Sequence, residues 1–153
     1  MKPAERPTIN PDMELLDAVS FAAVEEANAR LRELTDGFVE WALSEIRQAL
    51  GVLDGMIGDG VCDPAGRARV FDVLHNLKGQ GGTFDFHIVT RVCGVGCDLI
   101  RDQTPVSLSA LEKVQACCKV AEFALLHGFT GAGGERGREL LGKLEAVVAD
   151  PAA

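Results

Sequence analysis

Apolar residues recur at three- and four-residue spacings through most of this chain, and this periodicity restricts the folds open to it. Such spacing places apolar side chains on one face of an α-helix, whereas a half-buried strand has them at every second position. The pattern predicts helices over residues 12–34, 39–57, 64–82, 85–101, from about 105 or 109 to 125, and 139–148. The chain is therefore expected to be all-α.

Turn and capping residues separate these predicted helices. Thr35-Asp36-Gly37 and Gly58-Asp59-Gly60 predict helix ends. Asp63-Pro64 predicts a start, because Asp accepts hydrogen bonds from free N–H groups and Pro fits the first turn. Thr104-Pro105 and the capping box Ser109-x-x-Glu112 are two alternative starts for the next-to-last helix.

The segment 85–101 is the least regular part of the pattern, because its β-branched residues also fit a strand. Its apolar residues keep helical spacing, so we expect a helix there. We predict an antiparallel bundle with a four-helix core and short additional helical segments at both ends. Its expected limits are a flexible arm over 1–11, the bundle over 12–149 and a tail over 150–153.

Composition excludes several classes of function. The 153 residues are 47% hydrophobic and carry a net charge of −8, which disfavours binding to a nucleic-acid backbone. No stretch resembles a signal peptide or reaches the length of a membrane span, so a cytoplasmic protein without a membrane partner is expected. The five cysteines are an odd number, which favours reduced thiols over a disulfide framework.

The helix predicted over 64–82 has two different faces. At about 100° of rotation per residue, its apolar side chains fall within an arc of about 100°; they are Val70, Val73, Leu74 and Leu77. The other side carries a second group, here called the His75 face, which consists of Lys78, Gly82, His75 and Gly79. One face is expected in the core and the other in solvent.

Each residue type on the His75 face has a chemical use. A neutral imidazole nitrogen is a nucleophile near pH 7 and can attack the phosphoryl group of an aspartyl phosphate. Lys78, one turn along, brings positive charge to the oxygens of a transferring group. Glycine is unfavourable inside a helix, so Gly79, Gly81 and Gly82 need a reason, and close approach of another protein is one.

The segment HNLKGQGGTF (residues 75–84) resembles the His-x-x-Lys-Gly signature of histidine-containing phosphotransfer (HPt) domains. The resemblance implies an HPt-like helical bundle in which His75 is phosphorylated and Lys78 is the cation beside the phosphate. It implies that Gly79, Gly82 and Gln80 face the docking partner. The family commonly has a glycine ten residues after the histidine; here it is Asp85, which can cap the following helix.

The same resemblance implies the partners. These are receiver domains of response regulators and of a hybrid histidine kinase, which exchange phosphoryl groups with the HPt histidine. No cofactor or metal of the chain's own is expected, because the receiver supplies Mg²⁺. The sequence has no P-loop or kinase nucleotide motif, so we expect a phosphoryl carrier without autonomous kinase activity.

Two other functions stay open. One is a helical adaptor whose glycine-bearing face docks a partner without phosphoryl transfer. The other is a metal or redox sensor in which Cys93 and Cys97, four residues apart, act with Cys117, Cys118 or His87. The remaining histidine, His127, precedes Gly128 at a predicted helix end and is interpreted as a favourable cation there.

Overall fold

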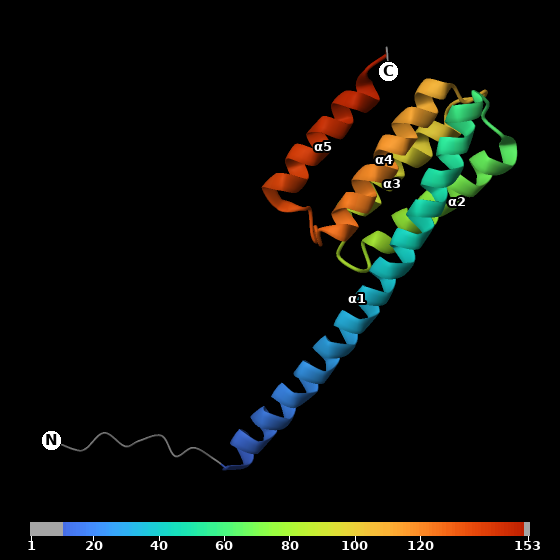
Figure 1. The fold of residues 1–153 in the computed structure, drawn as a ribbon. Coiled ribbons are helices and arrows are strands. Elements are labelled where there is room, and N and C mark those ends of the chain that lie inside the picture. Colours follow the sequence, from blue (N-terminus) through green and yellow to red (C-terminus); the bar gives the residue numbers. More distant parts are fainter. Residues whose placement is uncertain (1–10, 152–153) are drawn as a thin grey trace. The chain divides into compact units, whose positions relative to one another are not determined.

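The computed structural model describes residues 11–151 and confirms the all-α prediction (Figure 1). Its helices are α1 (Pro11–Asp59), α2 (Pro64–Gly81), α3 (His87–Arg101), α4 (Leu108–Leu126) and α5 (Gly134–Ala149). Within the described range there is no β-strand, only one isolated parallel bridge between Phe86 and Gly131. Residues 1–10 of the predicted arm and 152–153 of the predicted tail lie outside the described residues.

Helix α1 is one continuous helix, so the predicted break at Thr35-Asp36-Gly37 is wrong. The Thr35 hydroxyl donates a hydrogen bond to the Leu31 carbonyl at 2.8 Å, which is compatible with helical backbone. A single glycine costs a helix only about 1 kcal/mol, and strong helix formers lie within about a turn of Gly37 on both sides, at Glu33, Leu34 and Glu40. The helix ends after Asp59, where Gly60 takes a left-handed φ of 70°.

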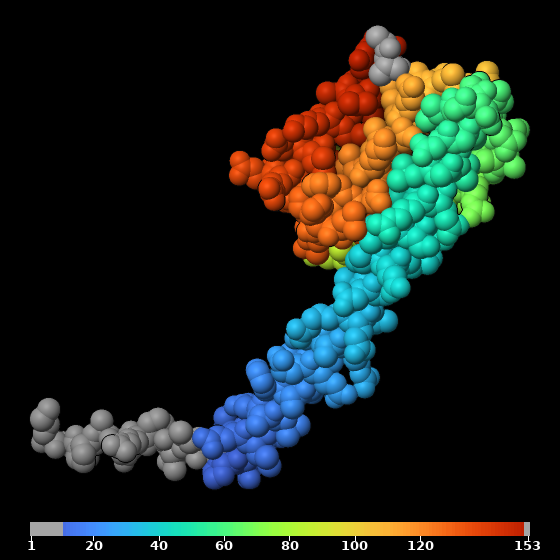
Figure 2. All heavy atoms as spheres, in the orientation of Figure 1, coloured from blue at the N-terminus to red at the C-terminus, as the bar shows by residue number. Residues whose placement is uncertain are grey.

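The described chain separates into two compact units, residues 11–37 and 38–151. In the second unit, the remaining part of α1 buries a regular series of apolar side chains: Phe38, Ala42, Ile46, Ala49, Leu53 and Met56. This part of α1 lies against α4 (Figure 2), where Arg47 and Glu122 form an ion pair at 3.0 Å. The Gln115 amide of α4 also donates to the Asp54 carboxylate.

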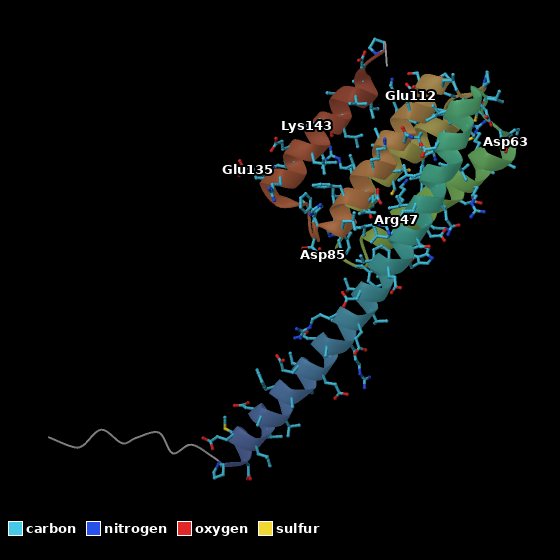
Figure 3. The ribbon with its side chains drawn as sticks, viewed as in Figure 1. Arg47, Asp63, Asp85, Glu112, Glu135 and Lys143 are labelled. Carbon is cyan, nitrogen blue, oxygen red and sulfur yellow. The ribbon has the colours of Figure 1, made fainter. Side chains whose placement is uncertain are left out.

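Helices α2, α3 and α4 pack in chain order, α2 against α3 and α3 against α4. Asp63 caps α2 as predicted, since its carboxylate accepts a hydrogen bond from the Gly66 amide at 2.8 Å (Figure 3). Segment 87–101 is a helix, as its spacing predicted. Gly96 allows close packing there, because a Cβ at this position would lie 2.9 Å from a Leu74 methyl group.

Helix α4 begins earlier than the predicted capping box. Ser107 is its N-cap, and the Ser107 hydroxyl accepts a hydrogen bond from the Ala110 amide at 3.1 Å. Ser109 lies inside the helix, and Thr104-Pro105 lies before it. Both predicted start positions are therefore wrong by a few residues, because Ser107 and not Thr104 or Ser109 is the N-cap.

Helix α5 begins at Gly134, five residues before the predicted start at 139. It packs on α4 and α3, and its buried apolar residues are Leu141 and Leu144. Arg91 of α3 and Glu145 of α5 form an ion pair at 2.6 Å. Across residues 11–151, no helix combines the length and apolar character that a membrane crossing requires.

Candidate functional site

The two faces of α2 lie as the spacing of its apolar residues predicts. Val70, Val73, Leu74 and Leu77 are 0–5% exposed and belong to the core. His75, Lys78, Gly79 and Gly82 are all exposed to solvent. Four buried apolar side chains therefore fix the rotation of α2 about its axis, and this rotation presents His75 outward.

The His75 ring has one aromatic neighbour among the described residues. Phe71, one turn earlier on α2, stacks on it with ring centroids 5.8 Å apart and planes 11° from parallel. Phe71 is itself half-buried against the core. The stacking restricts the imidazole on one side and leaves it open to solvent on others.

The Lys78 side chain lies over the backbone of Gly94 on α3. A Cβ built on Gly94 would lie 3.6 Å from Lys78 Cε and 3.7 Å from Lys78 Cδ. The bare glycine backbone thus receives the aliphatic part of the lysine. Lys78 forms no ion pair with any carboxylate of residues 11–151, so its ammonium group is available to an incoming anion.

The glycines at the end of α2 have different surroundings. Gly79 has open space where a Cβ would be, and a Cβ built on Gly82 would lie 3.8 Å from Nδ1 of the His87 ring. Gly81 is buried: a Cβ there would lie 2.5 Å from Thr90 Oγ1 and 3.0 Å from the Phe86 carbonyl oxygen. Gly81 therefore has a different reason from close approach of a partner, because it packs against α3.

Asp85 occupies the turn between α2 and α3 (Figure 3) in a left-handed conformation, with φ of 65°. Its carboxylate lies 3.3 Å from His87 Nε2. Helix α3 has Phe86 as its N-cap and no side-chain capping hydrogen bond. The interpretation of Asp85 as a cap is therefore wrong; the position needs a residue that tolerates left-handed backbone, as Gly and Asp do.

A groove of about 600 Å³ lies beside Phe71, along the N-terminal half of α2. Lys78 lies near the other end of this helix. The walls of the groove include Ala68, Phe71, Ile100 and Val106. The Arg67 guanidinium holds its edge by donating to the carbonyls of Ile100 and Gln103, at 2.8 and 3.3 Å. No sequence pattern indicates this groove, because it forms only where the α3–α4 connection folds back over α2.

Gln80, also predicted to face the partner, is exposed. Its backbone carbonyl accepts hydrogen bonds from the amides of Gly82 and Thr83. The third histidine, His127, is the C-cap of α4, as its position before Gly128 predicts. It packs on Phe123 with ring centroids 4.1 Å apart.

Four cysteines are buried on α3 and α4: Cys93, Cys97, Cys117 and Cys118. Burial raises the pKa of the Cys117 and Cys118 thiols to about 12. Burial also raises the pKa of Cys93 and Cys97, although the Lys78 ammonium opposes the shift at Cys97. In the part of the chain that the structure describes, no three His, Cys, Asp or Glu side chains are grouped to hold a metal ion.

Comparison of the chain with protein-family models, with curated proteins and with solved structures found no match.

Proposed function

We propose that this protein is a phosphorelay intermediate that carries a phosphoryl group on His75. The observation that carries the proposal is an exposed imidazole held on the solvent face of α2, directly opposite four buried side chains. A ring nitrogen of His75 attacks the phosphorus of a receiver's aspartyl phosphate. The P–N bond forms as the P–O bond to the aspartate breaks, leaving a carboxylate on the donor. A second receiver reverses the step.

Of the positively charged residues of the chain, Lys78 is the nearest to His75 in the sequence. The transferring phosphoryl group carries negative charge on its equatorial oxygens, so a cation one turn from the nucleophile stabilises the transfer. The position of the Lys78 stem over Gly94 restricts where the ammonium group can reach. Mg²⁺ belongs to the receiver in this proposal, and the chain supplies none of its ligands.

A receiver must approach closely for in-line transfer, and the surface around His75 favours that approach. Gly79 leaves open space one turn from His75, and Gly82 and Gln80 are exposed further along the helix. On the other side, Phe71 connects the imidazole to the apolar groove. The proposed partners, receiver domains of response regulators and of a hybrid histidine kinase, place this activity in the cytoplasm.

The test is transfer from receiver domains whose aspartate has been phosphorylated with a radioactive label. We expect the label to appear on this chain and to be stable in base and labile in acid. His75→Gln should abolish labelling completely. His87→Gln and His127→Gln are matched controls, because both rings are also surface imidazoles with an adjacent side chain, and both variants should accept the label. Label on the His75→Gln protein would contradict the proposal.

The alternative functions give different results in the same experiments. A helical adaptor would bind its receiver equally well with His75 or Gln at position 75, and neither protein would acquire label. A metal or redox sensor would carry zinc or iron after purification, at about one equivalent per chain. Less than about a tenth of an equivalent would remove the metal alternative.

A further inference from the structure

Residues 11–37 of α1 expose many large apolar side chains. Their exposed fractions run from 56 to 68%, and they are Met13, Leu15, Leu16, Val19, Phe21, Val24, Leu31 and Leu34. Single exposed apolar residues are ordinary, but a contiguous set on one helix indicates an interaction surface. A helix obtains most of its stability from packing its apolar face, so this segment is expected to have a partner.

Five of these eight residues, together with three small ones, form one narrow band, here called the N-terminal stripe. At about 100° per residue, its members fall within an arc of about 100°; they are Met13, Leu16, Ser20, Ala23, Val24, Ala27, Leu31 and Leu34. The other three, Val19, Phe21 and Leu15, lie outside the arc, about 90°, 110° and 130° from its centre. The stripe is therefore narrow enough to be covered by one further helix.

The stripe has the same pattern when it is read from either end. Its midpoint lies between Ala23 and Val24. At equal distances from that midpoint lie Ser20 and Ala27, then Leu16 and Leu31, then Met13 and Leu34. Two antiparallel copies would therefore match small residues with small ones at the centre and large residues with large ones at the ends. Small central residues allow helix axes to approach to about 8 Å.

Both halves of the segment are net negative. Its first half carries three acidic residues and no basic one, and its second half carries four acidic residues beside Arg30 and Arg32. Antiparallel copies keep the two first halves apart, but they still bring net negative charge beside net negative charge. The order of small and large residues along the stripe, and not charge, therefore favours the antiparallel direction. The net negative charge of the segment also disfavours an anionic membrane surface as the partner.

We propose that residues 11–37 bind a second copy of this chain, forming an antiparallel helix pair along the N-terminal stripe. The interaction is isologous, because each stripe residue meets its counterpart across a two-fold axis near Ala23 and Val24. The proposal does not depend on phosphotransfer by His75.

The first test is the mass of the full chain in solution, by light scattering or sedimentation. A dimer of the 16.3 kDa chain is expected, and Leu16→Glu combined with Leu31→Glu should give the monomer mass. Leu15→Glu is the matched control, because Leu15 and Leu16 are 66% and 65% exposed but only Leu16 belongs to the stripe. Circular dichroism of each variant confirms that the remaining helices have folded.

A second test fixes the direction of the pair. Protein carrying Ser20→Cys, mixed with protein carrying Ala27→Cys, should give disulfide-linked heterodimers, and each variant alone should give few. The unaltered chain measures the background from its native cysteines. Efficient linkage of each variant with itself would show parallel helices and contradict the proposal.

Three other outcomes would also overturn the proposal. The first is a wild-type chain that remains monomeric at about 100 µM, the usual range for weak association. The second is a dimer that survives the Leu16 and Leu31 substitutions. The third is a monomer that binds vesicles containing phosphatidylserine.

Discussion

Gly79 and Gly81 are two residues apart on α2, yet their surroundings differ completely. Gly79 faces open space, whereas Gly81 packs against Thr90 and the Phe86 carbonyl of α3. The sequence offers the same reason for both, since any glycine inside a helix needs an explanation. Only the rotation of α2 about its own axis, relative to α3, determines which glycine faces solvent and which one packs against α3.

This difference predicts opposite effects of the same substitution. Gly81→Ala should lower the free energy of unfolding by about 1–3 kcal/mol, because the new methyl group would force α2 and α3 apart. Gly79→Ala should raise it by about 0.5–1 kcal/mol, because alanine is the better helix former and nothing obstructs its Cβ. Urea denaturation of the two variants measures both values.

The Gly79 variant also separates stability from docking. If a receiver closes over this part of α2, Gly79→Ala should slow phosphoryl transfer from the receiver while the protein becomes more stable. An unchanged transfer rate would place the receiver elsewhere on the surface.

At the scale of elements, the turn between α2 and α3 depends on one unusual backbone conformation. Asp85 has φ of 65°, its amide donates to the Gly82 carbonyl, and its own carbonyl accepts from the Gly131 amide at 2.6 Å. The turn therefore holds the start of α3 and also the connection that leads into α5. A residue that cannot adopt this conformation would disturb both.

We expect Asp85→Val to lower the free energy of unfolding by about 1–2 kcal/mol, because β-branched residues are strained in the left-handed region. Asp85→Asn tolerates the same conformation and removes only the charge, so it should stay within about 0.5 kcal/mol of the wild type. Thermal or chemical denaturation compares the two. An equal loss in both variants would assign the effect to the pairing with His87 instead.

At the scale of the whole molecule, the core contains ionisable groups that the fold keeps neutral. The Cys117 and Cys118 thiols lie in the core on α4, and burial raises the pKa of each to about 12. In the unfolded chain the same thiols ionise near pH 9. The folded state therefore retains its protons in a range where the unfolded state loses them.

The consequence is a loss of stability in alkali. Stability from these thiols is fully present below about pH 9 and is lost as the pH rises toward 12. At pH 10 the loss should be roughly 1 kcal/mol for each thiol. Urea denaturation at pH 8 and pH 10 measures it, and a Cys117→Ala, Cys118→Ala double variant should show a smaller difference between the two pH values. An unchanged difference would contradict the assignment.

Much of this protein follows from its sequence. The apolar spacing predicted all-α structure, the Asp63 cap predicted the start of α2, and the rotation of α2 predicted which side chains are buried and that His75 is exposed. These features depend on short-range geometry, since helix period and capping are set by residues within a few positions of one another. The role of His75 itself stays a prediction.

Other features were decided only by tertiary packing. The continuity of α1 through Gly37, the contact of Gly81 with α3, the groove beside Phe71 and the left-handed Asp85 all escaped the sequence patterns. Each depends on contacts between segments that are far apart in the sequence, or on whether the rest of a helix is stable enough to include one residue of low helix propensity. Local propensities of about 1 kcal/mol cannot settle those outcomes, because the burial of whole helix faces contributes several times more.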